Sequence, residues 1–298
     1  MKIEFIQKII DKIRGKDMSV LKLNLNNLKN KLSNIEYKYS NFIASKERID
    51  GFINGSGNEI LCISGSTSDK ITFKYKAYSF KIKGDNNKIY FYNSNGINNC
   101  IPSGLNITIY GNNNIFKIYD SSFCNSKIYI EKNDNTFILE KPVKCIEGAY
   151  FCVERGATIH IQKNCELGNG KLRLFANGDY KNKHKIVVGE GTFIAHDAII
   201  RNSDGECLID YNSQAPLSEP KDIIIGKNCW ITSRCTILKG VNLPNGTIVG
   251  ACSLVNKKFE KENTLIAGTP ARIIKENVAW VPYSYGEYME KINNDFAY

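Results

Sequence analysis

The chain has 298 residues and 40 Lys and Arg against 30 Asp and Glu, so its formal net charge is +10 at pH 7. A chain of this length can bury a large core, and its basic character suits an anionic partner such as a nucleotide, an acidic glycan or a lipid surface. We expect no nucleic-acid partner, because the sequence contains no zinc-finger spacing or other nucleic-acid motif.

The ten cysteines do not form the pattern of a disulfide framework in so long a chain. No pair has the CxxC spacing, so we expect no metal site and a reducing, cytoplasmic location. The stretch MKIEFIQKIIDKIRGK is too charged for a signal peptide, and no apolar run reaches membrane-spanning length. Peripheral contact with a membrane stays open.

Residues 1–48 are expected to form an N-terminal helical segment. Apolar residues recur at helical spacing between Phe5 and Ile13. From Met18 to Phe42 they recur alternately three and four positions apart, which is the heptad seam of a coiled coil. The segment is either an oligomerising stem or an amphipathic helix that packs on the rest of the chain.

From 49 to 186, short β-rich runs alternate with turns rich in Asn and Gly, as in FKIKGDNNKIYFYNSNG and LNITIYGNNNIFKIYDS. Asn, Asp and Gly tolerate the left-handed backbone that tight corners need. Inward alternation is visible at Ile107 and Ile109. We predict irregular coils of a β-solenoid. A separate β-sandwich, which would pair strands far apart in the sequence, is the alternative.

Residues 187–275 carry a six-residue repeat. Aliphatic residues recur at Val188, Ile194, Ile200, Ile225, Ile231, Ile237, Leu243, Val249 and Val255. Small residues follow four positions after the later ones, at Cys229, Cys235, Val241, Thr247 and Ser253. Six is a multiple of the strand period of two but not of the helical 3.6, so the marked residues share one face of an extended chain. The pattern predicts solenoid coils with three short sides and about 18 residues each.

Two segments depart from the repeat. Residues 202–222 break its phase and contain Pro216 and Pro220, so they should protrude from the coil as a loop. Residues 276–298 form an aromatic C-terminal tail, which is expected to cover the last coil and to end in a short helix around Glu287 to Asn294.

The stretch IIIGKNCWITSRCTILKG, followed by AGTPARIIKENVAW, resembles the hexapeptide-repeat acyltransferases, above all the surface-polysaccharide and sialic-acid O-acetyltransferases. The resemblance covers roughly residues 186–280. It implies an all-β, left-handed parallel β-helix, a homotrimer, acetyl-CoA as co-substrate, and a glycan or sugar-nucleotide acceptor. The expected activity is O-acetylation of a hydroxyl of a surface polysaccharide, a lipo-oligosaccharide or its sugar precursor.

The family motif implied by this resemblance is Ser-Asp-x-His, followed 24 residues later by a tryptophan. This chain has Ser203, Asp204, Gly205 and Glu206, and Trp230 lies 24 positions after Glu206. Glu206 therefore stands where the family has its catalytic histidine. The departure puts the usual mechanism in doubt.

Three explanations are open. Burial beside Trp230 could raise the pKa of Glu206 from an ordinary value of about 4.3 and make it a base. His196 could supply an imidazole instead, although its position in the repeat points it outward. Activity could also be altered or lost. His184 and His160 are expected to be surface residues without a role.

Trp230 should lie outside the core, where it either lines the acceptor site or fills a subunit contact. The resemblance implies that the pantetheine of acetyl-CoA runs between subunits, and that its nucleotide end meets a turn and a group of cations. The residues expected to bind the cofactor are Ser233, Ala251, Ser253, Lys257, Lys258, Ala267, Thr269 and Arg272.

Other functions stay open at this point. An amine acceptor would relax the need for a strong base, so N-acetylation of a nucleotide-linked amino sugar is the main alternative. A catalytically silent solenoid that serves as a scaffold or binds glycans is another, because the family histidine is missing. An acetyltransferase of small sugars, of the maltose or galactoside type, is the last.

Overall fold

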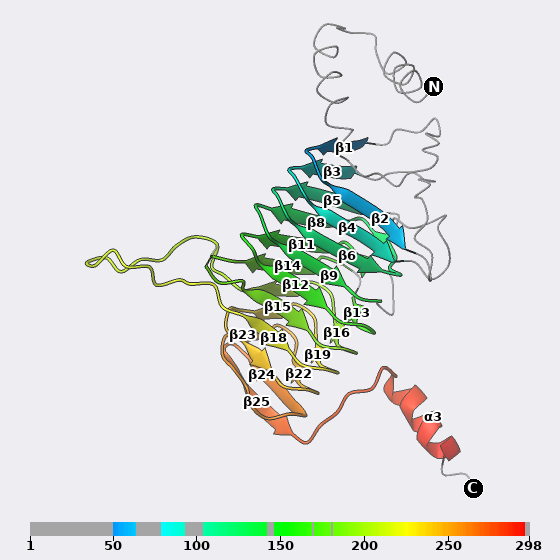
Figure 1. Cartoon of the computed structure of the whole chain (residues 1–298). Helices are drawn as coiled ribbons and strands as arrows, with labels where there is room; N and C mark the ends of the chain where they lie inside the picture. The colour runs from blue at the N-terminus through cyan, green and yellow to red at the C-terminus, as the bar shows by residue number, and fades with distance from the viewer. Residues whose placement is uncertain are drawn as a thin grey trace, which may run out of the picture.

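The computed structural model of the chain describes residues 50–63, 79–92, 104–141, 146–168, 170–179 and 181–295. The helical segment expected at 1–48 lies outside these residues. The described residues form a solenoid in which three parallel sheets run along the axis (Figure 1). The predicted all-β, left-handed parallel β-helix with a short C-terminal helix is thereby confirmed.

The sheets contain strands from successive coils. The first sheet consists of β1 (Asp50–Asn54), β3 (Ser79–Lys83), β5 (Leu105–Tyr110), β8 (Ser126–Glu131), β11 (Tyr150–Glu154), β14 (Arg173–Asn177), β17 (Ile199–Arg201), β20 (Thr236–Ile237) and β23 (Leu254–Val255). The second consists of β2 (Glu59–Ile63), β4 (Lys88–Tyr92), β6 (Ile115–Tyr119), β9 (Thr136–Leu139), β12 (Thr158–Ile161), β15 (Lys185–Val188), β18 (Ile223–Ile225) and β21 (Asn242–Leu243).

The third sheet consists of β13 (Glu166–Leu167), β16 (Phe193–Ile194), β19 (Trp230–Ile231), β22 (Ile248–Val249), β24 (Thr264–Gly268) and β25 (Ala271–Glu276). A short pair, β7 (Phe123–Cys124) and β10 (Ile146–Glu147), accompanies the earlier coils. Each strand of the upstream coils pairs in parallel with its equivalent in the next coil, as β5 does with β8. This pairing belongs to a solenoid, so the β-sandwich alternative is wrong.

The six-residue repeat faces the core as predicted. From Val188 to Val255, every aliphatic residue of the repeat is at most 1% exposed. Cys229 and Cys235 occupy the small inward positions and are fully buried. Burial of these apolar faces between coils is what stabilises the solenoid.

A ladder of buried asparagines supports the upstream turns between the first and second sheets. The Nδ2 group of Asn87 donates to Oδ1 of Asn58, Asn114 to Asn87, and Asn135 to Asn114, each at 2.9 Å. The ladder ends at Gly156, whose N–H donates to Oδ1 of Asn135 at 2.9 Å. Each side chain thereby provides the hydrogen-bond partner that the amide of its neighbour would otherwise find in water. These hydrogen bonds offset the free-energy cost of burying the polar groups.

Turns between sheets form corners along the axis. We call the turns from the first to the second sheet the first corner, and those from the third sheet to the first sheet of the next coil the third corner. Residues 202–222 leave the solenoid at the first corner, between β17 and β18, and project far from it (Figure 1).

The C-terminal tail differs from the prediction. Helix α3 (Tyr285–Asp295) lies away from the last coil (Figure 1), and Tyr285 is 82% exposed. The edge of the third sheet is instead occupied by β25, which pairs antiparallel with β24. The helix therefore does not cover the last coil, and the hairpin pairs the last parallel strand of this sheet instead.

Candidate active site

Turns at the third corner stack on one another as a continuous column. One residue in each of three turns has a left-handed backbone, with φ of 59° at Asp197, 58° at Arg234 and 59° at Cys252. The N–H of Arg234 donates to the carbonyl of His196 at 3.1 Å, and that of Cys252 to the carbonyl of Ser233 at 3.0 Å. Equivalent side chains therefore recur at the same place from coil to coil.

His196 lies in this column between two polar partners. Its Nε2 is 3.0 Å from Oγ of Ser233, and its Nδ1 is 3.0 Å from Oδ2 of Asp197. The side chains of His196 and Asp197 are 49% and 39% exposed in the single chain. The histidine therefore points outward, as its position in the repeat predicts.

The charge state of Asp197 favours one arrangement of protons. Hydrogen bonding from His196 lowers the pKa of the Asp197 carboxyl, which stays ionised at neutral pH. An ionised carboxylate accepts a hydrogen bond from an Nδ1–H group, and in that tautomer Nε2 of His196 is an acceptor. The hydroxyl of Ser233 then donates to Nε2. This arrangement can take a proton from a hydroxyl group.

Several of the predicted cofactor residues line the same column. They are Ser233, Ala251, Ser253, Ala267 and Thr269. The buried hydroxyl of Ser253 donates to the carbonyl of Gly250 at 2.6 Å and accepts the N–H of Gly268 at 3.1 Å. Oγ1 of Thr269 lies 3.5 Å from the carbonyl of Cys252.

Small side chains are required along this column. A β-carbon added to Gly250 would lie 2.8 Å from the β-carbon of Ala267. Ala251 is exposed beside it. The small side chains thus let the turns of neighbouring coils stack closely at the third corner.

The predicted cationic residues do not all lie together. Arg272 is exposed and pairs with Ala267 across the hairpin of β24 and β25, at the end of the column. Lys257 and Lys258 follow β23 at the first corner instead. Lys257 packs over the ring of Phe259 with Nζ 5.5 Å from the ring centroid. Within one chain, the two lysines are separated from the column.

The Ser203–Glu206 motif also lies at the first corner. Nε and Nη2 of Arg201 donate to the carbonyls of Ser203 and Asp204, at 2.8 and 2.7 Å. The ammonium of Lys239 forms an ion pair with Asp204. The motif is thus held in place, but the side chain of Glu206 is exposed and forms no hydrogen bond or ion pair with the described residues.

Glu206 and His196 are therefore at different corners of one chain. Beyond Glu206 the loop forms a narrow hairpin, in which the N–H of Leu217 donates to the carbonyl of Leu208 at 2.6 Å. Leu208, Leu217 and Tyr211 are 63%, 58% and 88% exposed. Exposed apolar side chains of this size on a projecting loop mark a surface of association.

Trp230 forms part of an aromatic cluster on the third sheet. Its ring stacks on Phe193 of the preceding coil, with centroids 6.5 Å apart and planes 7° apart. Trp280 from the C-terminal tail packs on both rings, at 5.9 Å from Trp230 and 6.1 Å from Phe193. The indole N–H of Trp280 donates to the carbonyl of Asn228 at 2.7 Å. The indole nitrogen of Trp230 is buried and has no partner among the described residues.

Sequence reasoning missed three of these residues. Asp197 directly follows the histidine, so the His-Asp dipeptide was a usable signal. Phe193 lies one coil before Trp230 and was recognisable once the register of the coils was known. Trp280 has no sequence signal that places it on Trp230, because the tail lies outside the repeat.

The other two histidines have partners. The prediction that His184 is an exposed surface residue is wrong, since its side chain is 17% exposed and its Nδ1 is 3.3 Å from Oδ1 of Asp222. Its burial follows from the turn that packs on the next coil. His160 lies on strand β12, and its Nε2 is 2.8 Å from Oε1 of Glu140.

Within the described ranges, no helix has the length and apolar character needed to cross a membrane. The same residues contain no cluster of His, Cys, Asp and Glu suited to a metal ion.

Comparisons with known proteins find polysaccharide O-acetyltransferases among the relatives of this chain. No family model matches the chain. The chain is 31% identical over 201 residues to a polysialic acid O-acetyltransferase of Neisseria meningitidis, which covers 64% of this chain and 89% of that protein. It is 33% identical over 98 residues to a polysialic acid O-acetyltransferase of Escherichia coli O1:K1, which covers 33% of this chain and 32% of that protein.

Among solved structures, the polySia-specific acetyltransferase NeuO is similar with a TM-score of 0.56 and 22% identity. The likeness covers 82% of this chain and 100% of that one, and concerns the fold.

Proposed function

The chain belongs to the hexapeptide-repeat acetyltransferases, in the group of the polysialic acid O-acetyltransferases. We propose that it transfers an acetyl group from acetyl-CoA to a hydroxyl of a surface polysaccharide. The relatives carry out O-acetylation according to their names, and one of them is matched over nearly its whole length. Such a transfer needs a base for the attacking hydroxyl and a groove that holds the long donor in line.

The base in this proposal is His196. The observation that carries it is the chain of contacts from the Asp197 carboxylate through the imidazole to the Ser233 hydroxyl, with both distances 3.0 Å. An imidazole has an ordinary pKa close to neutral, whereas a carboxylate is a weak base toward a sugar hydroxyl. His196 thereby takes the role that the histidine of the Ser-Asp-x-His motif has in the family, and Glu206 does not.

The donor groove in this proposal is the third-corner column. A pantetheine arm is narrow and carries two amide groups, so it suits a surface of small side chains such as that from Ser233 to Thr269. When bound, acetyl-CoA supplies an activated acetyl thioester beside His196. Arg272 at the end of the column would pair with phosphate groups of the donor.

The functional unit in this proposal is a homotrimer. The motif around Asp204 and Glu206 lies at the first corner, whereas His196 lies at the third. Packing of the first corner of one protomer against the third corner of the next would bring the two parts together. The exposed apolar side chains of the loop, among them Leu208 and Tyr211, would be covered by that contact.

Two further points complete the proposal. Trp230 lies on the third sheet beside the column, so its aromatic cluster would form one wall of the acceptor site. We place the reaction in the cytoplasm, because Cys124, Cys152, Cys165, Cys207, Cys229, Cys235 and Cys252 are free thiols.

The test is a thiol-release assay of the full chain with acetyl-CoA and hydroxyl acceptors, with polysialic acid and neutral glycans as separate arms. We expect CoA release that depends on a glycan, and an alkali-labile acetyl ester on the product. An amino sugar serves as the comparison acceptor. An alkali-stable amide as the main product, or no CoA release with any acceptor, would contradict O-acetylation.

A further inference from the structure

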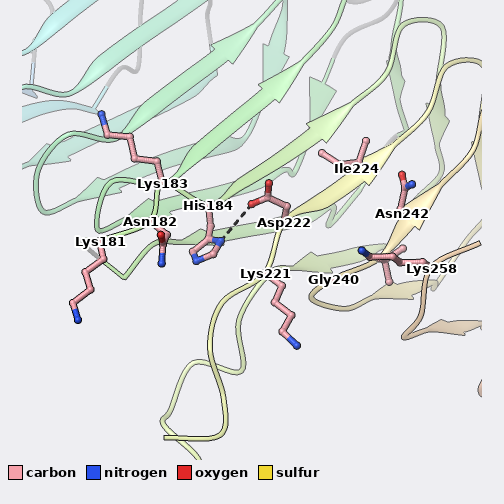
Figure 2. A pocket seen from close by; sticks show the side chains of 11 residues that line it. Lys181, Asn182, Lys183, His184, Lys221, Asp222, Ile224, Gly240, Asn242 and Lys258 are labelled. Carbon is pink, nitrogen blue, oxygen red and sulfur yellow. Dashed lines mark hydrogen bonds and ion pairs between the residues drawn. The ribbon is translucent and has the colours of Figure 1, made fainter.

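A pocket with a volume of about 850 Å³ lies at the first corner, and Figure 2 shows the residues that line it. The pocket is away from the third-corner column that contains His196. Its lining comes from four successive coils. Lys181, Lys183 and His184 come from the turn between β14 and β15, Lys221 from the end of segment 202–222, and Lys258 from the residues after β23.

The charge of this pocket is strongly positive. Four lysines line it, and the carboxylate of the lining belongs to Asp222. That carboxylate is already used, since Oδ1 of Asp222 lies 3.3 Å from Nδ1 of His184 and accepts the N–H of Lys185 at 3.1 Å. None of the four lysine ammonium groups pairs with a carboxylate of the described residues.

A second carboxylate near the pocket, that of Asp179, also has hydrogen-bond and ion-pair partners within the protein. Asp179 accepts the N–H groups of Asn182 and Lys181, at 2.5 and 3.0 Å, and lies 3.7 Å from Nε2 of His184. These contacts fix the turn that carries Lys181 and Lys183. The acidic groups therefore shape the pocket, and the lysine charges are left for a ligand.

The lysines are spread along the solenoid axis. Neighbouring strands lie about 4.8 Å apart, so the lysines of the first and fourth coils are separated by about 14 Å along the axis. That span exceeds the size of one carboxylate or one phosphate. It suits an extended ligand with a negative charge on successive units.

The pocket adjoins the loop that carries the Ser203–Glu206 motif. The N–H of Lys221 donates to the carbonyl of Asn202 at 2.9 Å, which closes the base of the loop. Gly240 of the lining follows Lys239, the partner of Asp204. A glycan in the pocket would thus extend along the base of the loop.

We propose that this pocket is an anion-binding subsite for the acceptor, in which Lys181, Lys183, Lys221 and Lys258 bind carboxylates on successive units of an acidic polysaccharide. The proposal rests on the O-acetyltransferase function proposed above and adds the site that selects a charged acceptor over a neutral one. Phosphate groups of CoA share the same anionic chemistry, and the experiment distinguishes the two sources.

The test uses the full chain with Lys183→Ala, Lys221→Ala and Lys258→Ala combined. A matched control combines Lys141→Ala, Lys163→Ala and Lys227→Ala, which removes the same charge from exposed lysines outside the pocket. Calorimetric titration measures the Kd for polysialic acid and, separately, for CoA. We expect the pocket variant to bind polysialic acid about tenfold more weakly, with an unchanged Kd for CoA and a weaker salt dependence, and the control to match the wild type.

Each other outcome is informative. Weaker binding of CoA with unchanged binding of polysialic acid would assign the pocket to the donor and overturn the proposal. An equal loss in the control would also overturn it, because general charge would then explain the effect. Since binding is measured without turnover, a failure of acetylation would count against the proposed function and not against the pocket.

Discussion

Nε2 of His196 and Oγ of Ser233 lie 3.0 Å apart, although the two residues are 37 positions apart in the sequence. They meet because β16 pairs with β19, with Ile194 opposite Ile231, so the turns that follow these strands stack in register. The contact thus depends on the parallel pairing of two coils. Substitution of either residue should change the site without changing the solenoid.

Replacement of His196 should remove most of the activity. If the imidazole accepts the proton of the attacking hydroxyl, His196→Asn should lower kcat by about 10²–10⁴-fold. The KM for acetyl-CoA should change little. Initial rates of CoA release at saturating acceptor measure the effect.

Glu206→Gln provides the comparison, because it removes the charge at the position where the family has its catalytic histidine and keeps the shape of the side chain. We expect a decrease of less than about tenfold in kcat. A larger loss for Glu206→Gln than for His196→Asn would identify Glu206 as the base.

Asp197→Asn should act through His196. An amide can donate to Nδ1 and stabilise the wrong tautomer, so we expect kcat to decrease while the KM for acetyl-CoA stays the same. The hydrogen bond from His196 lowers the pKa of Asp197, so the wild-type carboxyl is ionised at neutral pH and the Asn variant lacks that charge. Asp197→Glu should recover part of the rate, which a purely structural role would not require.

Thiol labelling should report occupancy of the column. Burial raises the pKa of Cys229 to about 11 and that of Cys165 to about 12, so neither thiol should react with iodoacetamide near neutral pH. Cys252 and Cys124 are exposed and should react. Saturating CoA should protect Cys252, which lies in the column, and should leave Cys124 unchanged. Peptide mass spectrometry measures the labelled fractions. Unchanged labelling of Cys252 with CoA bound would argue against the groove.

Disruption of the asparagine ladder should destabilise the upstream coils. Asn114 is fully buried, accepts the N–H and amide of Asn135, and donates to Asn87. Asn114→Ala should lower the free energy of unfolding by about 1–3 kcal/mol, because buried groups lose their partners. Denaturant unfolding measures the change. Asn212→Ala, in the exposed loop, is the control and should have no effect.

The sequence predicted the parts of the fold that follow its period. The aliphatic residues that recur every six positions from Val188 to Val255 must be buried on one face, and an extended chain places them all on the same face. The burial of Asn114 was not predicted, because asparagine at a turn usually faces solvent and only stacking of equal turns satisfies its amide. His184 was assigned to the surface for a similar reason, since its partner Asp222 lies on another coil.

The candidate site was predictable only in part. The column residues from Ser233 to Thr269 were named from family resemblance, and their alignment at one corner follows from the repeat. Asp197 was overlooked because its contact with the His196 side chain does not follow the six-residue repeat. The lysine pocket at the first corner could not be predicted without the order of the coils, because Lys183 and Lys258 are far apart in the sequence.

Stacking of equal coils also makes the length of the solenoid adjustable. Insertion of one complete turn of chain upstream of β11 would move everything before it by about 4.8 Å and leave the pairing after it intact. Loss of three residues within 187–275 would instead exchange inner and outer faces and unfold that region. The number of upstream turns thus sets how far β1 lies from His196 along the axis.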